Sequence, residues 1–318
     1  MALLEVRDLE TVFALDGRRV HAVDHVSFEL DAGRVLGLVG ESGCGKSMTA
    51  LSLMRLVPPP GHIAGGHVLL DGQDILALPE RRMRELRGAG LAMVFQEPMT
   101  ALNPVFTVGS QIAEALRLHR RMGRGEAWDR ATALLAEVGI PEPARRAHDY
   151  PHQLSGGMRQ RVMIAIAISC EPRVLIADEP TTALDVTIQA EILELLRELR
   201  ERHGMALLLI THDLGVVAEQ ADEVAIMYAG RIVEQAPVTE IFDHPLHPYT
   251  QALLRSMPGV RGRRERLEAV PGTVPDLLHL PSGCAFHDRC PLAIEACAAQ
   301  VPPLDEKAPD HRAACIRV

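Results

Sequence analysis

The sequence contains few aromatic residues, no long hydrophobic run and no excess of positive charge. Aromatic residues make up 3% of the 318 residues, which argues against a protein that stacks nucleic-acid bases on aromatic side chains. The formal net charge is -9, so a broad basic surface that binds polyanions is not expected. We find no apolar stretch of 18 residues, and the chain is therefore not expected to cross a membrane by itself.

The N-terminus also lacks the pattern of a secretory signal. MALLEVRDLE carries acidic residues early, and no basic segment precedes a long apolar stretch. We therefore expect the six cysteines to lie in a reducing cytoplasm, where disulfides are their least common use. Hydrophobic residues are abundant, at 47% of the chain, which is enough for one large domain and a smaller one.

A glycine-rich segment, LVGESGCGKS at 38–47, follows a short apolar run and precedes a segment of helical character. The apolar run is typical of a strand buried on both faces. In this context the pattern G-x-x-x-x-G-K-[ST] indicates a phosphate-binding loop rather than a chance turn. Its backbone N–H groups would surround phosphate, Lys46 would reach the β- and γ-phosphates, and Ser47 would ligate Mg²⁺. The predicted loop consists of Gly40, Glu41, Ser42, Gly43, Cys44 (as a small spacer), Gly45, Lys46 and Ser47.

Two later apolar runs end in polar residues. VLIADEP ends in Asp178 and Glu179, which we expect to hold the Mg²⁺ shell and to polarise the attacking water, respectively. Paired acids at a strand end are otherwise ordinary turn residues. MALLLITHD brings His212 to the end of another strand, where it either has a structural role or points at the γ-phosphate.

A second glycine-rich segment, QLSGGMRQR at 153–161, lacks the lysine of a phosphate loop. Ser155 is expected to cap a helix that continues through the apolar run MIAIAIS. A helix N-terminus with two glycines favours an anion.

These motifs together resemble the ATP-binding cassette (ABC) ATPases. They occur in the order of that family: GESGCGKS, MVFQEP with Gln96, LSGGMRQR, VLIADEP, ALD ending at Asp185, and ITHD. The resemblance covers residues 1 to about 235. It implies an α/β fold, the P-loop NTPase cassette, with a RecA-like parallel sheet, an antiparallel β subdomain and a helical subdomain at about 87–160.

The resemblance also implies that two cassettes face each other head to tail, so that each ATP contacts both. Ser155, Gly156 and Gly157 would then contact the ATP of the partner cassette. Asp185 would communicate across the dimer.

Three further roles follow from the same resemblance. Gln96 would sense the γ-phosphate and join Ser47 and Asp178 at Mg²⁺. His212 would contact the γ-phosphate and help to hold the water of Glu179. Phe13, in TVFALDG, would stack on adenine; the alternative is an ordinary core phenylalanine.

Four features narrow the resemblance to the first of the two ATPase subunits of dipeptide, oligopeptide or nickel importers. They are Met158 in the signature, EPMTALNP at 97–104, HPLHPYTQALL at 244–254 and PGTVPDLLHLPSGCAFHDRCP at 271–291. This implies ATP hydrolysis that drives peptide uptake, at the cytoplasmic face of the cell membrane. The implied partners are a second, different ABC ATPase, two transmembrane permease subunits and an extracytoplasmic substrate-binding protein, with no nucleic acid. The alternatives are a nickel importer and, from another class, a non-transport ABC ATPase that acts on nucleic acid or ribosomes.

Local patterns predict the organisation around these motifs. HVLLDGQDI and VAIMYAGRIVEQ are typical of hairpins, and VGSQIAEALRLH and AWDRATALLAEVGI of helices. The second helix is taken as simply amphipathic rather than as a partner-binding face. Prolines become frequent after the second hairpin, which predicts a cassette at 1–235 and a loop-rich module at 236–318. RGRRER at 261–266 is interpreted as a solvated linker rather than a nucleic-acid patch.

Four of the six cysteines lie in the last 35 residues, with the spacing C-x5-C-x6-C-x17-C. Such clustering suits zinc or an iron–sulfur cluster, but the spacing lacks the close CxxC pairs of zinc sites, so unbonded thiols remain an alternative. His287 could replace one ligand. The resemblance implies a [4Fe–4S] cluster on Cys284, Cys290, Cys297 and Cys315, remote from hydrolysis. Cys170 is expected to be a buried core residue.

Overall fold

The computed structural model describes residues 2–15, 17–257, 270 and 272–318. The segment RGRRER lies outside the described residues. The chain forms two compact units. The first unit comprises Met1–Leu30, Val35–Leu76 and Leu209–Val318, and the second comprises Asp31–Arg34 and Ala77–Leu208.

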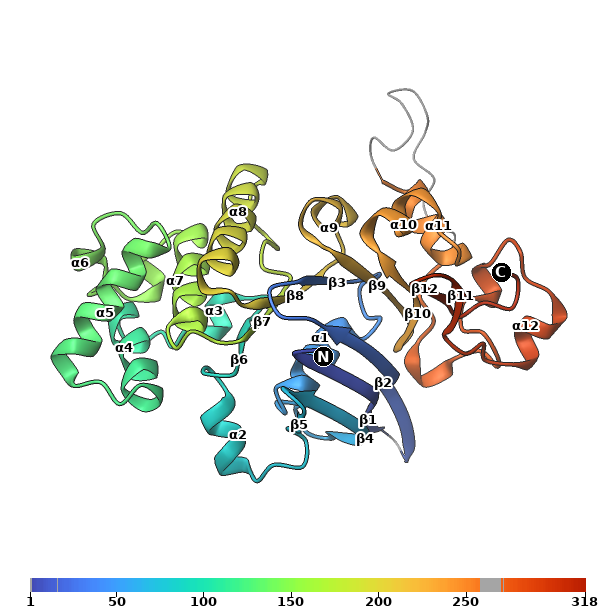
Figure 1. The fold of residues 1–318 in the computed structure, drawn as a ribbon, viewed down its shortest axis with the longest axis horizontal. Helices are drawn as coiled ribbons and strands as arrows, with labels where there is room; N and C mark the ends of the chain where they lie inside the picture. Colours follow the sequence, from blue (N-terminus) through green and yellow to red (C-terminus); the bar gives the residue numbers. More distant parts are fainter. Residues whose placement is uncertain (1, 16, 258–269, 271) are drawn as a thin grey trace. The chain divides into compact units, whose positions relative to one another are not determined.

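The first unit contains an antiparallel sheet with the strand order β2-β1-β4-β5 (Figure 1). β4 and β5 are joined by Asp71 and Gly72, both with positive φ (56° and 78°), as in the tight turns that favour Asp-Gly. The predicted hairpin over HVLLDGQDI is therefore confirmed. The strands of this sheet are β1 Leu4–Leu15, β2 Arg18–Leu30, β4 Gly61–Leu70 and β5 Gln73–Asp74.

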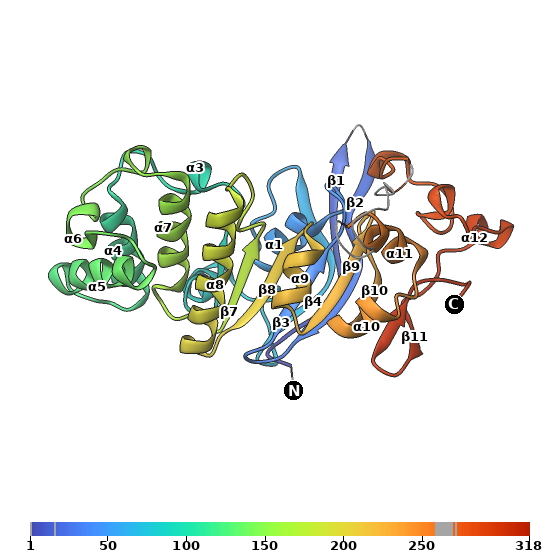
Figure 2. The ribbon, with the colours of Figure 1, turned by 90° about the horizontal axis from the view of Figure 1, so that it is seen from above.

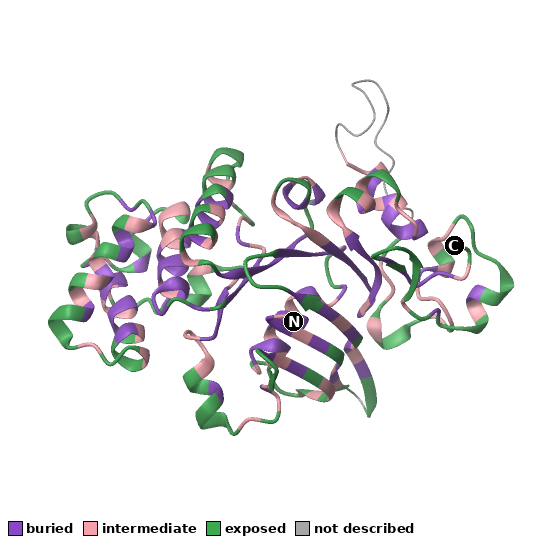
Figure 3. Cartoon of the chain, viewed as in Figure 1, coloured by how far each residue is buried: buried purple, intermediate pink, exposed green. Residues whose placement is uncertain are grey.

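The buried strand predicted before the phosphate loop is β3, Val35–Val39, and all five of its residues are buried. It pairs in parallel with β9, Glu223–Tyr228, which forms an antiparallel hairpin with β10, Arg231–Pro237. Both predictions are confirmed. The purple strands in Figure 3 show this burial. In the first unit the strand order is β11-β12-β10-β9-β3, followed by the residues of β8 from Leu209 on. The bounds are β8 Ala206–Thr211, β11 Asp305–Ala308 and β12 His311–Ala313.

The C-terminal region is joined to β10 by a buried polar residue. Glu234 is 0% exposed and accepts hydrogen bonds from the N–H groups of Leu246 and His247 (2.6 and 2.9 Å) and from Nε2 of His311 (2.7 Å). A buried carboxylate needs such partners, because an unpaired one would carry a large desolvation cost. The first unit also contains α1 Lys46–Leu53, α9 Leu214–Gln220, α10 Val238–Asp243, α11 Pro248–Arg255, α12 Glu295–Ala299 and two 3-10 helices, Leu277–His279 and His287–Arg289.

The second unit pairs two short buried strands, β6 Leu91–Val94 and β7 Val174–Asp178, in parallel. Helices α4 to α7 gather beside one another (Figure 2). The helices predicted over VGSQIAEALRLH and AWDRATALLAEVGI are confirmed as α4 and α5, and Cys170 is buried as expected. The helices are α2 Glu80–Leu86, α3 Pro98–Ala101, α4 Val108–His119, α5 Arg124–Glu137, α6 Pro143–Arg146, the 3-10 helix Pro151–Gln153, α7 Gly156–Ile168 and α8 Val186–His203.

Within the described part of the chain, every helix is too short or too polar to span a bilayer.

Candidate functional site

The predicted phosphate loop lies between β3 and α1 in the first unit. Lys46, the first residue of α1, is only 4% exposed. Its Nζ donates hydrogen bonds to the backbone oxygens of Gly40 (2.8 Å) and Glu41 (3.0 Å). The ammonium group is thus held against the loop that it belongs to. α1 starts without a side-chain cap, and the first N–H groups of a helix are those that bind anions.

Two glycines let the loop approach neighbouring strands. A Cβ on Gly40 would lie 2.2 Å from the carbonyl oxygen of Met227, and one on Gly45 would lie 2.3 Å from that of Ala22. Gly45 also has φ 107°, a conformation that L residues rarely adopt. The sequence predicted that these glycines leave room for phosphate. The structure shows that they also allow the loop to pack closely against β9 and β2. A Cβ on Gly43, which has φ 80°, would meet no atom within 4 Å.

The remaining loop residues differ in exposure. Ser42 and Gly43 are exposed, and Ser47 is half-buried. Cys44 is 0% exposed, and burial raises the pKa of its thiol, although Lys46 acts in the opposite direction. Cys44 is therefore a neutral, packed side chain, which agrees with its interpretation as a spacer.

Glu41 is held by two residues from outside the phosphate loop. Arg289 forms a two-pronged ion pair with its carboxylate, and the hydroxyl of Tyr249 accepts a hydrogen bond from its backbone N–H. Both partners lie more than 200 positions away in the sequence. Both residues lie in segments that carried the family resemblance, Tyr249 in 244–254 and Arg289 in 271–291, but nothing in those segments indicated a contact with the phosphate loop.

The predicted catalytic carboxylate lies in the second unit. Asp178 is the last residue of β7 and 4% exposed. Glu179, which follows it, has φ 45°. Such a conformation is costly for a non-glycine residue and is found most often at functional sites. Oε2 of Glu179 accepts hydrogen bonds from Nε2 of Gln96 (3.0 Å) and from Oγ1 of Thr182 (2.7 Å). The structure thus brings Gln96 and Glu179 into contact, and Thr182 joins them without having been predicted.

The signature segment starts α7. Ser155 caps the helix as predicted, because its hydroxyl accepts a hydrogen bond from the N–H of Met158 (3.3 Å). Ser155 and Gly156 are exposed. A Cβ on Gly157 would lie 2.8 Å from a methyl group of Ile188 in α8, so the starts of the two helices pack closely. Asp185, predicted from the ALD motif, caps α8 by accepting from the N–H of Ile188 (3.0 Å).

Two further predicted residues, His212 and Phe13, belong to the first unit. His212 is exposed and directly follows β8. Phe13 is only partly buried near the end of β1, and its ring lies close to Gly61, where a Cβ would lie 2.6 Å away. Phe13 is therefore not a fully buried core side chain.

The prediction of an iron–sulfur cluster was wrong. Among the residues that the structure describes, no group of three or more His, Cys, Asp or Glu side chains is placed to hold a metal ion. The same finding gives no support to the zinc alternative. None of the six cysteines forms a disulfide. The cluster predicted on Cys284, Cys290, Cys297 and Cys315 is corrected accordingly.

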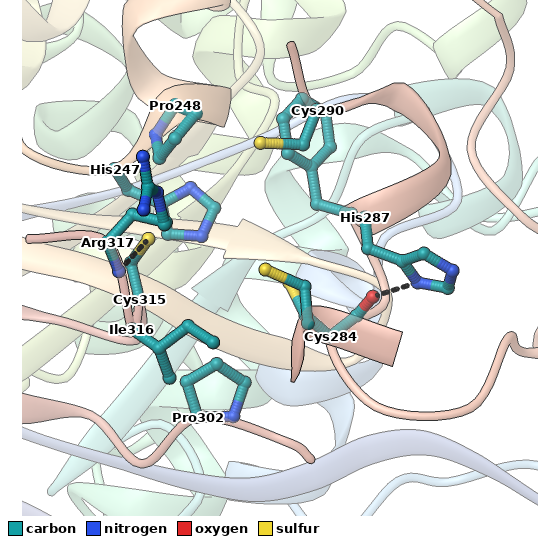
Figure 4. Close-up of a pocket in the computed structure, with 11 residues that line it drawn as sticks. His247, Pro248, Cys284, His287, Cys290, Pro302, Cys315, Ile316 and Arg317 are labelled. Carbon is teal, nitrogen blue, oxygen red and sulfur yellow. Dashed lines mark hydrogen bonds between the residues drawn. The ribbon is translucent and has the colours of Figure 1, made fainter. Parts of the chain in front are cut away.

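The four cysteines lie near one another without forming a metal-binding group among the described residues. All four line one cavity. In Figure 4 the ring of His287 points away from the cysteine sulfur atoms. Nδ1 of His287 is hydrogen-bonded to the backbone oxygen of Cys284 at 2.8 Å. Burial raises the pKa of the Cys284 and Cys290 thiols.

The comparisons with known proteins agree with this arrangement of motifs. Residues 23–182 match the family described as ABC transporter, and residues 233–297 match the oligopeptide/dipeptide transporter C-terminal region. The chain is 55% identical over 317 residues to the "Probable peptide ABC transporter ATP-binding protein y4tR" of Sinorhizobium fredii, covering 99% of this chain and 95% of that protein. It is 50% identical over 315 residues to the dipeptide transport ATP-binding protein DppD of Escherichia coli K12, covering 99% and 96%.

Solved structures give the same answer for the fold. The dimeric ATP-binding cassette MJ0796 bound to ADP and phosphate aligns with a TM-score of 0.67 at 26% identity, covering 74% of this chain and 98% of that one. The cassette protein cbiO1 of Clostridium perfringens, part of the transporter complex cbiONQ, aligns with a TM-score of 0.64 at 27% identity, covering 76% and 91%. The fold is the ABC ATPase cassette with α/β sheets, and the chain belongs to the ATP-binding proteins of the ABC transporter family.

Proposed function

We propose that the chain is the ATP-hydrolysing subunit of an importer that carries dipeptides or oligopeptides across the cell membrane. The main support for a peptide cargo is the match of residues 233–297 to the oligopeptide/dipeptide transporter C-terminal region, on the same chain as the phosphate loop. The names of the relatives, which are transport proteins for peptides, support the same cargo. Residues 1–235 form the nucleotide-binding cassette in this proposal, with its helical subdomain at about 87–160. Residues 236–318 form a C-terminal extension.

The first unit binds the triphosphate. Backbone N–H groups of the loop and of the start of α1 surround the phosphate oxygens, as the uncapped helix start allows. Lys46, already held within the loop by two carbonyl oxygens, exchanges these contacts for the β- and γ-phosphates. Phe13, partly exposed at the strand end, stacks on the adenine.

The residues proposed to hold Mg²⁺ suit that ion. Asp178 offers a buried carboxylate, Ser47 a hydroxyl and Gln96 a side-chain carbonyl. Mg²⁺ prefers oxygen ligands of these kinds and keeps several waters. Bound there, it would neutralise negative charge on the phosphate oxygens.

The second unit supplies the carboxylate for the hydrolytic step. The carboxylate of Glu179 accepts a hydrogen bond from the attacking water and aligns it with the β–γ bond. Gln96 and Thr182 fix the orientation of this carboxylate through the hydrogen bonds at 3.0 and 2.7 Å. His212 contacts the γ-phosphate and helps to hold the water. The products are ADP and phosphate.

Two cassettes are required for turnover. The signature residues Ser155, Gly156 and Gly157 cover the ATP on the loop of a second ATPase subunit, which we propose is a different chain. Asp185 links the two sites across this dimer. Closure of the dimer drives two transmembrane permease subunits, and an extracytoplasmic binding protein delivers the peptide. The chain accordingly works at the cytoplasmic face of the membrane.

The test is transport by the assembled importer in proteoliposomes. We expect ATP-dependent uptake of labelled dipeptides or oligopeptides and no uptake with a non-hydrolysable analogue. Uptake of Ni²⁺ without peptide uptake would contradict the proposal that the cargo is a peptide. Copurification with ribosomes or duplex DNA in place of permease subunits would overturn the transport role.

A further inference from the structure

The C-terminal region contacts the phosphate loop at Glu41, the second loop residue. Nη1 and Nη2 of Arg289 donate to the two carboxylate oxygens of Glu41 at 2.7 and 3.0 Å. The backbone N–H of Glu41 donates to the hydroxyl of Tyr249 at 3.0 Å. Its backbone oxygen accepts from Lys46 at 3.0 Å. The same oxygen also accepts from the N–H of Cys44 at 3.3 Å. Every polar group of this one loop residue therefore has a partner, and two of the four partners belong to the C-terminal region.

The Arg289 side chain is packed rather than solvated. It is 6% exposed, its Nη1 also donates to the hydroxyl of Tyr228 at 3.3 Å, and its guanidinium carbon lies 5.7 and 5.8 Å from the ring centroids of Tyr228 and Phe286. Two-pronged arginine–carboxylate pairs fix geometry as well as charge. An exposed ion pair would contribute little, but this one is shielded on the arginine side, and its aromatic surroundings favour the cation.

The aromatic residues beneath this ion pair form one cluster. The ring centroids of Tyr228, Tyr249 and Phe286 lie 4.6 to 5.3 Å from one another, and all three side chains are at most 1% exposed. Two of the three tyrosines in the chain are thus placed within reach of Glu41 or of its partner. The cluster sets the position of the Tyr249 hydroxyl independently of the loop.

The backbone around Arg289 is equally well fixed. Arg289 ends the 3-10 helix His287–Arg289, which lies between Cys284 and Cys290. The N–H of His287 donates to the oxygen of Cys284 at 3.0 Å, and the N–H of Cys290 donates to that of His287 at 3.2 Å. The C-terminal region therefore offers a rigid support to the loop.

We propose that Arg289 and Tyr249 are positioning residues for nucleotide binding, because they hold Glu41 and thereby the conformation of the phosphate loop. This inference depends on the proposed function, in which the loop binds ATP. Because the N–H of Glu41 is bound to Tyr249, other N–H groups of the loop and of the start of α1 must bind the phosphates. Loss of either contact frees Glu41, and the loop then spends part of its time in conformations that do not match the triphosphate.

The experiment measures binding of a fluorescent ATP analogue with Mg²⁺ to the full chain, together with amide hydrogen exchange of the loop peptide. Arg289→Gln removes the ion pair, and Tyr249→Phe removes one hydroxyl but keeps the ring. Arg312→Gln is the matched control, because Arg312 is an exposed arginine of the same C-terminal region. Arg289→Lys keeps the positive charge but loses the two-pronged geometry.

We expect Arg289→Gln to raise the Kd about tenfold, within the usual range of coupling between sites. Tyr249→Phe should raise it about threefold, as expected for the loss of one neutral hydrogen bond. Arg289→Lys should recover part of the loss, and Arg312→Gln should bind as the unchanged chain does. Glu41→Gln combined with Arg289→Gln should be no weaker than Arg289→Gln alone, because both remove the same contact. Exchange should quicken in the loop peptide and not across the chain. In the assembled importer, KM for ATP should rise with kcat unchanged.

Two results would overturn this inference while leaving the proposed function intact. In the first, the unchanged chain binds the analogue and the Arg289→Gln and Tyr249→Phe variants bind it with the same Kd. The other is faster exchange throughout the first unit, which would show that these residues only stabilise the fold. If the unchanged chain does not bind the analogue at all, the proposed function itself fails.

Discussion

The two units hold their functional side chains in different ways. In the first unit Lys46 is 4% exposed and bonded to backbone oxygens, and Glu41 is held by the C-terminal region. In the second unit Gln96, Ser155 and Asp185 are less deeply buried, and Glu179 is held by neighbouring side chains. Lys46 and Glu41 of the first unit are therefore held firmly in the phosphate loop, whereas the second unit presents most of its predicted site residues near its surface, with Asp178 as the buried exception. Substitutions should accordingly alter binding and stability in the first unit, and turnover in the second.

The largest expected effect is on hydrolysis in the second unit. Glu179→Gln keeps the hydrogen bond from Thr182 but weakens the proton acceptor for water, so the rate of ATP hydrolysis should fall about 10³-fold. Equilibrium binding of ATP should stay within about twofold of normal. Glu198→Gln, at an exposed position of α8, is the control. Near-normal turnover by the Glu179→Gln variant would refute the assignment of this residue.

Glycine-to-alanine substitutions in the two units should differ clearly in their effect on the free energy of unfolding. Gly45→Ala forces a Cβ to within 2.3 Å of a backbone oxygen at φ 107°, and should lower the free energy of unfolding by more than about 2 kcal/mol. Gly156→Ala meets its nearest atom, a methyl of Leu184, at an ordinary 3.6 Å and should leave the fold unchanged. Gly43→Ala, strained but in open space, should cost about 1–2 kcal/mol. Denaturant unfolding measures all three, and equal costs for Gly45→Ala and Gly156→Ala would contradict the comparison.

The burial of the first unit also predicts a pH dependence. His247 is 1% exposed, its Nδ1 accepts from the N–H of Tyr249 at 3.1 Å, and burial lowers its pKa to about 4. In the unfolded chain its pKa is about 6.5. Between these values only the unfolded chain binds the proton, so the free energy of unfolding should fall as the pH is lowered from about 6.5 to about 4, by about 2 kcal/mol at pH 5.

The matched variant for this pH effect is His247→Asn, which keeps a side-chain acceptor at a helix N-terminus but does not titrate. Unfolding at pH 7 and pH 5 should show a smaller loss in the variant than in the unchanged chain. Identical losses in both proteins would exclude His247 as the source.

The smallest effect is expected at the signature helix. Ser155→Ala removes the cap on the N–H of Met158 and should cost about 1 kcal/mol of stability. Ser155→Asp restores an acceptor for that N–H and should recover the stability, but its negative charge should oppose the triphosphate of the partner cassette. Turnover of the assembled importer should therefore fall with Asp while the fold is retained. Full turnover with Asp would argue against any contact between Ser155 and ATP.

The motifs that could be predicted from the sequence depend on local geometry. A buried strand, a glycine loop and a helix follow one another within about twenty residues, so the order of residue types determines their arrangement. The same holds for the cap formed by Ser155 and for the Asp-Gly turn between β4 and β5. Such features need no knowledge of the distant chain.

The features that could not be predicted depend on contacts between distant segments. Arg289 and Glu41 are separated by 248 positions, and no local pattern relates them. The prediction of a metal cluster on the four cysteines failed for a similar reason. Intervals of five, six and seventeen residues in a loop-rich region do not determine where the sulfur atoms point. Their number suggested a metal site, but the described residues contain no group of side chains placed to hold a metal ion.

The most direct measurement of the central claim is an electron cryomicroscopy map of the assembled importer that carries Glu179→Gln and bound ATP. The account predicts a triphosphate on the Gly40–Ser47 loop of one cassette, with Ser155 to Gly157 of the facing cassette against its γ-phosphate. A map in which Ser155 lies far from every bound nucleotide would contradict it.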